Sequence, residues 1–292
     1  MRVRKAVFPA AGWGTRFLPA TKAQPKEMLP LVDKPIIQYG VEEAVAAGIE
    51  QIIIVTSTHK GAIEDHFDLN YELEHLLEEK GEIEKLRQIR AITDLAQLAY
   101  VRQKEQLGLG HAVLMAKDLI GHEPFAVILP DDVCIGDRPV IGQLIHAYHQ
   151  THGSVVAVME VPPEETSRYG VIASEPTDDP LDHGRLHRVT RLVEKPAPKD
   201  APSNLGIIGR YVLTPKIFDK LEQTQRGAGG EIQLTDAIQA LMEEQQVFAY
   251  AFEGVRYDAG TTMGWLKASV ELALQRPELG PEFRAYLSSI QP

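Results

Sequence analysis

Short apolar runs alternate with amphipathic segments through the first half of the chain, and this alternation limits the possible folds more than any other feature. AVFPA (6–10), QIIIVT (51–56) and FAVIL (125–129) have the length and composition of buried strands. IIQYGVEEAVAAG (36–48) has the spacing of a helix. Strands that alternate with helices form a parallel sheet whose faces the helices cover. The sequence therefore predicts an α/β fold with a mixed, mostly parallel central sheet flanked by helices.

The rest of the chain continues this pattern with two kinds of interruption. A helix predicted over 139–153 leads into a further strand at 154–161. Between residues 65 and 92 a charged, helix-favouring stretch breaks the alternation, and we interpret it as a solvated helical insertion. Proline and aspartate gather at 175–184 and 195–204, which predicts loops around a more irregular second half.

Composition limits the partners and the compartment. The formal net charge of -11 argues against a surface that attracts nucleic acid or anionic lipid, although a few local cations can still bind small phosphates. No stretch reaches the roughly 20 apolar residues that a membrane helix needs, and we do not expect the N-terminal residues to be a secretory signal. Cys134 is the single cysteine, so an intrachain disulfide is impossible and a reducing cytoplasm is expected.

A glycine-rich loop from Ala10 to Arg16 follows the first predicted strand directly. Gly12 and Gly14 let the backbone approach a ligand closely, so that amide N–H groups can converge on phosphate oxygens. Arg16 and Lys26 add positive charge nearby. The loop lacks the third glycine of the dinucleotide fingerprint and the GxxxxGK[ST] order of a P-loop. It predicts a phosphate-binding turn of neither common type.

The longer string around this loop is far more specific. GWGTRFLPATKAQPKEMLP (12–30) resembles the signature of the sugar-1-phosphate nucleotidyltransferases, and its PKEMLP ending is similar to that of the bacterial UTP–glucose-1-phosphate uridylyltransferases. The resemblance continues in family order to about Lys267, through YVRQKEQLGLGHAV, LPDD, RYGVI, VEKP, SNLGIIGRYVL, GGEIQLTDAI and YDAGTTMGW. It departs at Trp13, where a smaller aliphatic residue is expected, and at THK (58–60).

This resemblance implies a Rossmann-like nucleotidyltransferase fold and a reaction. The phosphate of glucose 1-phosphate attacks UTP in line, giving UDP-glucose and pyrophosphate with the help of Mg²⁺. It also implies a cytoplasmic homo-oligomer, a dimer or a tetramer. We expect a single domain over 1–292, with a nucleotide-binding half (1–153) that carries the insertion at about 68–92, a sugar-binding half (154–262) and a C-terminal helical segment (263–292).

The resemblance also assigns roles to particular residues. Arg16 and Lys26 match residues that hold and polarise the triphosphate, and Lys195 can bind the sugar phosphate. The pair Asp131 and Asp132 follows an apolar strand, where ligands bind open α/β sheets. Asp131 resembles the family's metal-binding aspartate, and Asp258 matches a second aspartate that completes the same metal site. Mg²⁺ commonly takes one or two protein carboxylates together with water and substrate phosphate.

Further residues are expected around the nucleotide and the sugar. The carboxamide of Gln103 complements the N3–H and carbonyl edge of uracil, and of thymine equally. The expected nucleotide-binding residues are Ala10, Ala11, Gly12, Gly14, Thr15, Glu27, Gln103 and Gly108, and the expected sugar-binding residues are Asp132, Gly170, Glu194 and Asn204. For Glu231, Gln233 and Asp236 two roles stay open, contact with substrate or capping of the helix that follows, in which Thr235 could also serve.

Three alternatives compete with uridylyl transfer. A thymidylyltransferase acting on glucose 1-phosphate would share the glycine loop and the aspartates. A nicotinamide-dependent dehydrogenase is disfavoured, because the third glycine and the following acidic residue are not placed as its fold requires. A non-catalytic sugar-nucleotide sensor is disfavoured because the charged residues Arg16, Lys26, Asp131 and Lys195 are all present.

Overall fold

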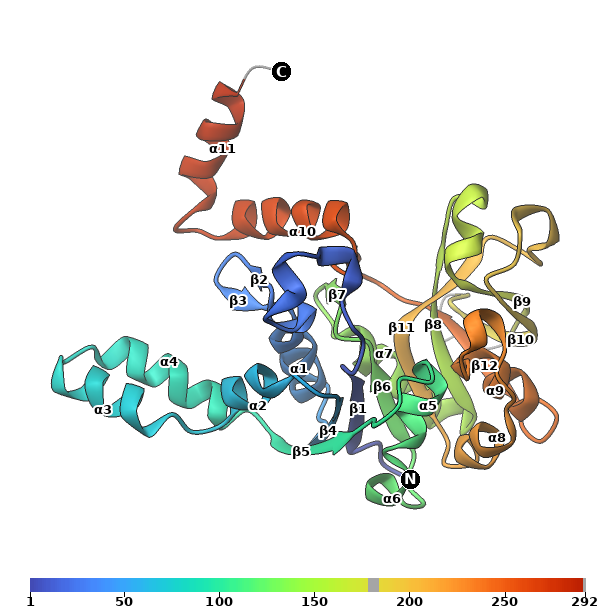
Figure 1. Ribbon diagram of the computed structural model, residues 1–292. Coiled ribbons are helices and arrows are strands. Elements are labelled where there is room, and N and C mark those ends of the chain that lie inside the picture. The colour runs from blue at the N-terminus through green and yellow to red at the C-terminus, as the bar shows by residue number, and fades with distance from the viewer. Residues whose placement is uncertain (178–183, 291–292) are drawn as a thin grey trace.

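A nine-stranded mixed sheet forms the centre of the computed structural model, which describes residues 1–177 and 184–290 (Figure 1). Its strands lie in the order β5 (Gln97–Arg102), β4 (Gln51–Thr56), β1 (Lys5–Pro9), β6 (Phe125–Ile128), β11 (Leu205–Leu213), β8 (Ser154–Glu160), β12 (Val247–Ala251), β10 (Leu186–Glu194) and β9 (Gly170–Pro176). The strands predicted at 6–10, 51–56, 125–129 and 154–161 are confirmed as β1, β4, β6 and β8.

Strand direction divides the sheet. β5, β4, β1 and β6 run parallel, as the alternation with helices predicts. β11 is antiparallel to both β6 and β8, and β10 is antiparallel to both β12 and β9. β12 is parallel to β8. Seven of the nine strands of this sheet therefore point the same way, which confirms the expected mixed, mostly parallel sheet. The two reversed strands, β11 and β10, both come from the second half of the chain.

Helices cover both faces of the sheet (Figure 1). The bounds are α1 (Ile36–Ala46), α2 (Gly61–Phe67) and α7 (Val140–Thr151) on one face, and α5 (Leu109–Leu114), α6 (Lys117–Ile120), α8 (Ile217–Gln223) and α9 (Leu234–Leu241) on the other. In β1, Ala6 and Phe8 point into the first core and Val7 into the second. Because successive side chains alternate between the faces, a strand buried on both sides must be apolar throughout.

Two helical segments lie outside these layers. The predicted insertion is confirmed as a hairpin of α3 (Tyr71–Glu79) and α4 (Ile83–Thr93), which extends away from the sheet in Figure 1. α10 (Thr262–Gln275) and α11 (Gly280–Ser289) form the C-terminal arm. The loop expected at 195–204 holds one short 3-10 helix, and most of the loop expected at 175–184 lies outside the described residues. Across the described ranges, every helix is too short or too polar to cross a bilayer.

A smaller unit joins the sheet to the glycine-rich loop. β7 (Asp132–Ile135) pairs antiparallel with β13 (Val255–Asp258), and the short strands β2 (Pro30–Leu31) and β3 (Lys34–Pro35) form a second ladder. A separate apolar cluster of Phe17, Leu29, Val133, Tyr257 and Leu272 packs these elements together with α10. Segments that are far apart in the sequence are thereby fixed around the carboxyl end of β6.

Candidate active site

Two adjoining cavities open where β1 and β6 end. The first, here called the loop cavity, has a volume of about 570 Å³ and lies beside the glycine-rich loop. The second, the sheet cavity, has a volume of about 430 Å³ and lies beside β9, β10 and β11. Arg16, Leu109, Leu129, Asp131 and Glu231 line both, so the two cavities form one cleft. This is the edge at which open α/β sheets bind ligands.

Most of the residues expected to bind substrate line this cleft. Around the loop cavity lie Ala11, Gly12, Gly14, Thr15, Arg16, Lys26, Glu27, Gln103, Gly108 and Asp131. Around the sheet cavity lie Arg16, Asp131, Asp132, Gly170, Glu194, Lys195 and Asp258. Two expected residues lie outside both linings. Ala10 is fully buried in the core, where its N–H donates to Val55 O, and Asn204 is exposed, with its carbonyl accepting from Val161 N.

Gly12 and Gly14 of the loop are glycines for different structural reasons. Gly14 has φ +68°, and a side-chain carbon there would lie 3.2 Å from Lys26 Cβ, so a glycine allows the loop to pack on the Lys26 turn. Thr21 Oγ1 fixes the same turn by donating to Gly14 O at 2.8 Å. At Gly12 a side-chain carbon would meet no atom within 4 Å, so space there is left open on the cavity side.

Lys26 and Asp131 form an ion pair at the junction of the two cavities. Lys26 Nζ lies 2.5 Å from Asp131 Oδ2, and about a quarter of each side chain is exposed. Burial acts against the charge on Lys26, but Asp131 and Glu27 outweigh it and raise the pKa of Lys26. Burial likewise opposes the Asp131 carboxylate, yet Lys26 holds the pKa of Asp131 below its usual value. Both groups are therefore charged at neutral pH.

Asp131 and Asp258 converge on Gly260. A side-chain carbon on Gly260 would lie 2.6 Å from Asp131 Oδ2 and 3.2 Å from Asp258 Oδ1. Arg168 donates to the other Asp258 oxygen at 3.0 Å. No group of three or more His, Cys, Asp or Glu suited to a metal occurs in the described part of the chain. Two oxygen-donor carboxylates beside a phosphate site nevertheless fit Mg²⁺, which completes its shell with water and substrate phosphate.

Asp132, expected to bind sugar, has its carboxylate engaged by protein groups. Its Oδ1 pairs with the Arg256 guanidinium, whose Nε lies 2.7 Å away, and its Oδ2 accepts from Gly209 N at 2.8 Å. Arg256 continues to the Tyr169 hydroxyl at 3.1 Å. Asp132 thus anchors the wall of the sheet cavity, and Arg256 and Tyr169, which the sequence did not single out, present their side chains to it.

Gln103 is held at the base of the loop cavity. Its Nε2 donates to Gly108 O at 3.1 Å and to His111 Nδ1 at 2.9 Å. Burial lowers the pKa of His111, so its neutral ring can accept at Nδ1. The Gln103 Oε1 atom makes no hydrogen bond to another described residue. Gly108 has φ +103°, and the space of its missing side chain is occupied by Glu231 and Ile232.

Glu194 and Lys195 form an ion pair in the sheet cavity, at the end of β10. Lys195 Nζ lies 3.2 Å from Glu194 Oε1, and Lys195 adopts φ +45°, a strained backbone region that costs about 1–3 kcal/mol. A side-chain carbon on Gly170 would come within 3.1 Å of Thr235 Oγ1 and 3.3 Å of Glu194 Oε2. Glycine at 170 therefore keeps this carboxylate accessible from the cavity.

The segment GGEIQLTD, left open by the sequence, also contributes to the cleft. Helix α9 begins after Gln233 and has no side-chain cap, so capping by Thr235 or Asp236 is wrong. Glu231 lines both cavities, and Gln233 and Thr235 line the sheet cavity. The length of the motif GGEIQLTD was the sequence signal for this role. A helix cap needs fewer residues, so capping alone would not account for the whole motif.

Two contacts behind the loop had no sequence signal. Gln106 Nε2 donates to Ala11 O at 2.8 Å and so holds the glycine-rich loop. Lys60, within the departing THK string, reaches Glu27 at 2.6 Å. Trp13, the other departure, lines the loop cavity with 70% of its surface exposed. Trp13 therefore lines the loop cavity directly, and Lys60 contacts Glu27, another residue of its lining.

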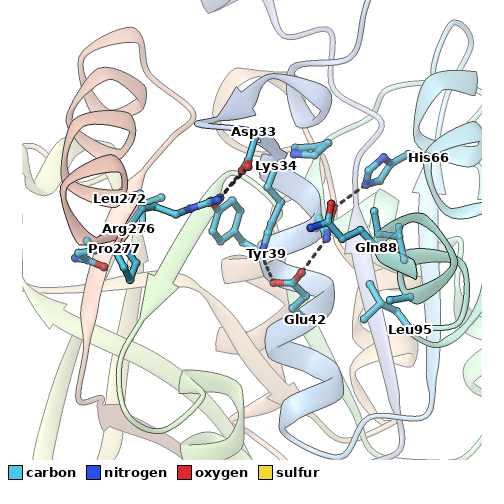
Figure 2. A pocket seen from close by; sticks show the side chains of 15 residues that line it. Asp33, Lys34, Tyr39, Glu42, His66, Gln88, Leu95, Leu272, Arg276 and Pro277 are labelled. Carbon is cyan, nitrogen blue, oxygen red and sulfur yellow. Dashed lines mark hydrogen bonds and ion pairs between the residues drawn. The ribbon is translucent and has the colours of Figure 1, made fainter. Parts of the chain in front are cut away.

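A third cavity, of about 600 Å³, lies between α1, α4 and α10. Figure 2 shows the side chains that line it. Its charged groups pair with one another: Lys34 with Glu42, Arg276 with Asp33, and Gln38 between Glu42 and His66. The cleft at the end of β6 is the better candidate for an anionic substrate, because it combines the glycine-rich loop with Arg16, Lys26 and Lys195 at the edge where open α/β sheets bind ligands.

Comparison with known proteins agrees with this geometry. Residues 5–275 match the model of the nucleotidyl transferase family. The chain is 56% identical over 289 residues to a UTP–glucose-1-phosphate uridylyltransferase of Staphylococcus epidermidis, covering 99% of both. It is similar to a UTP-bound UGPase from Acinetobacter baumannii (43% identity, TM-score 0.90, 99% and 100% of the two chains). It is also similar to a UDP-glucose pyrophosphorylase complexed with UDP-glucose (47% identity, TM-score 0.84, 94% and 100%). As its motifs predict, the chain belongs to the nucleotidyl transferase family.

Proposed function

We propose that this chain transfers the uridylyl group of UTP to glucose 1-phosphate, forming UDP-glucose and pyrophosphate. The observation that carries this proposal is the junction of the two cavities at Arg16 and Asp131, with Lys26 bound to Asp131. A nucleotide in the loop cavity and a sugar phosphate in the sheet cavity would meet there. The relatives named for UTP and UDP-glucose support the same pair of substrates.

The reaction needs positioning and charge stabilisation rather than a strong base. A phosphate monoester has a second pKa of about 6, so the attacking oxygen is already ionised near neutral pH. Lys195 and Arg16 bring this anion towards a second anion, the triphosphate, and offset their repulsion. Lys26 and Arg16 stabilise charge as it develops on the transferring phosphoryl group and on the leaving pyrophosphate.

Asp131 and Asp258 would hold Mg²⁺ at this junction, as their convergence on Gly260 suggests. When bound, the cation would supply Lewis-acid stabilisation of the phosphate oxygens. In the protein alone, Lys26 and Arg168 neutralise the two carboxylates. The pairing with Lys26 lowers the pKa of Asp131 and so favours its ionised form, which is the form that binds a cation.

The base and the hexose would lie at opposite ends of the cleft. Gln103 Oε1 is placed to accept the N3–H of a pyrimidine, because its Nε2 is occupied by Gly108 and His111. Glu194 can accept from two neighbouring sugar hydroxyls. The proposed division into a nucleotide-binding and a sugar-binding half follows this arrangement.

One assay tests the assignment. Purified protein with Mg²⁺ and glucose 1-phosphate is offered UTP, dTTP, ATP or GTP separately, and pyrophosphate release is measured. We expect turnover with UTP to exceed turnover with each other nucleotide. A preference for dTTP would reject uridylyl transfer, and absence of turnover with every nucleotide would favour a sensor.

The enzyme is also proposed to be a cytoplasmic homo-oligomer, a dimer or a tetramer. α11 extends away from the body in Figure 1. Phe283, Tyr286 and Leu287 share one face of α11, and Ile290, directly after its last residue, continues the same sequence spacing. Tyr286 and Ile290 are 59% and 52% exposed, which is typical of a helix face that awaits a partner.

Tyr286→Lys is therefore expected to lower the assembled mass in light scattering, because a charge would enter the apolar face. Ala285→Lys adds the same charge to the opposite face of α11 and should leave the mass unchanged. Equal masses for wild type and Tyr286→Lys would show that α11 lies outside the subunit interface.

A further inference from the structure

Arg210 is a fully buried cation directly behind the cleft. It lies in the middle of β11 with none of its side chain exposed. Glu43 of α1 pairs with it, at 2.7 Å from Nη2 and 3.1 Å from Nε. Glu43 is itself fixed, because its Oε1 accepts from Ile141 N at 2.8 Å. The guanidinium is thus held from behind by α1 and α7, which leaves its other donors directed towards the end of β6.

Those donors reach the backbone on both sides of Asp131. Nη1 donates to Leu129 O at 3.2 Å and Nη2 donates to Asp132 O at 2.7 Å. The neighbouring Gly209 adds two bonds to the same turn, accepting from Leu129 N and donating to Asp132 Oδ2, each at 2.8 Å. Asp131 therefore lies in a turn whose preceding and following residues are tied to one segment of β11.

The residue type matters for this contact. A buried ion pair alone is weak evidence for stability, since apolar residues of similar volume often replace one without loss. A guanidinium, however, presents a rigid fork of donors that can bridge two carbonyls and a carboxylate at once. A lysine ammonium is a single point and cannot span the same acceptors.

We propose that Arg210 is the positioning residue for the metal-binding turn: by bridging Leu129 O and Asp132 O it fixes the Asp131 carboxylate towards the divalent cation. The inference rests on the proposed function, because it takes Asp131 as a ligand of the cation. Outer partners that orient a metal ligand commonly change metal affinity by about 10–100-fold when they are replaced.

The test uses Arg210→Lys, which keeps the positive charge next to Glu43 and loses the bridge. Mn²⁺ affinity is measured by water-proton relaxation on the full chain with UDP-glucose present, so that no turnover is required. We expect the dissociation constant for Mn²⁺ to rise by about tenfold. The Mg²⁺ concentration for half-maximal turnover should rise in parallel, while the KM for glucose 1-phosphate stays unchanged.

Ser154→Ala is the matched control. Ser154 is fully buried at the start of β8, at the end of the strands that lies away from the cleft. Its hydroxyl accepts hydrogen bonds from Thr214 N and Gln245 Nε2. Its loss should lower stability but leave Mn²⁺ affinity unchanged. If Arg210→Lys does not unfold cooperatively, the double variant Glu43→Leu with Arg210→Leu, which leaves no buried charge unpaired, should show the same loss of Mn²⁺ affinity.

Unchanged Mn²⁺ affinity in the folded Arg210 variants would overturn the proposal, as would an equal loss in Ser154→Ala. It would also be overturned if Asp131→Asn bound Mn²⁺ as tightly as the wild type. If the wild type transferred no uridylyl group but the Arg210 variants still lost Mn²⁺ affinity, the proposed function would fail and the positioning role would stand.

Discussion

Asp131→Asn is expected to lower kcat for uridylyl transfer by about 10³-fold or more. The substitution keeps the shape of the side chain but removes the charge that is proposed to bind a divalent cation and that pairs with Lys26 at 2.5 Å. The pKa of Asp131 is held below its usual value, so the wild-type carboxylate is charged throughout the neutral range. The measurement is kcat at saturating UTP, glucose 1-phosphate and Mg²⁺.

Asp33→Asn is the matched control. Asp33 also pairs with a cation, Arg276, but it is 65% exposed and belongs to the separate cavity between α1, α4 and α10. Its kcat should equal that of the wild type. Thermal unfolding of Asp131→Asn distinguishes lost chemistry from lost structure. A folded Asp131→Asn protein with kcat near the wild type would contradict the site described above.

An alternating sequence pattern shows where strands and helices lie but not the direction of each strand, and this limits how much of the fold was predictable. β1 and β4 are buried on both faces, so their apolar runs marked them as parallel strands between helices. β11 is equally apolar, and no local pattern reveals that it runs against β6 and β8. Direction depends on the connection through space, which single-sequence reasoning does not supply.

The same limit separates the site residues that were expected from those that were missed. Lys26 and Asp131 were assigned by resemblance, and the fold brings them together across 105 positions. Asp132 was expected to bind sugar, but Arg256, 124 positions later, pairs with its carboxylate. A partner at that distance is set by the pairing of β7 with β13, and the composition of neither strand indicates it.

A charged residue inside an apolar run predicts a buried ion pair, and this signal was not used for Arg210. Arg210 interrupts the apolar run LGIIGRYVL, where an unpaired cation could not be accommodated, so a buried acidic partner was required. Its identity as Glu43, on α1, was not readable. Lys60 had no such context, because it follows β4 and does not interrupt an apolar run.

Lys60→Met is expected to lower the free energy of unfolding by about 3–5 kcal/mol. The side chain of Glu27 is fully buried and that of Lys60 is 6% exposed, with 2.6 Å between Nζ and Oε2. Glu27 Oε1 is buried without a hydrogen-bond partner in the described part of the chain. Without Lys60, both oxygens of this carboxylate would lack compensation. Urea unfolding followed by circular dichroism measures the loss.

Two further variants separate burial from simple pairing. Lys117→Met breaks an exposed pair with Glu222 of similar length, 2.7 Å, and should cost less than about 1 kcal/mol. Glu27→Leu with Lys60→Met removes both buried charges and should recover most of the stability, because no ion is left unpaired. Equal losses for Lys60→Met and Lys117→Met would mean that water reaches Glu27 in solution. The buried Glu27–Lys60 pair would then contribute no more to stability than an exposed pair does.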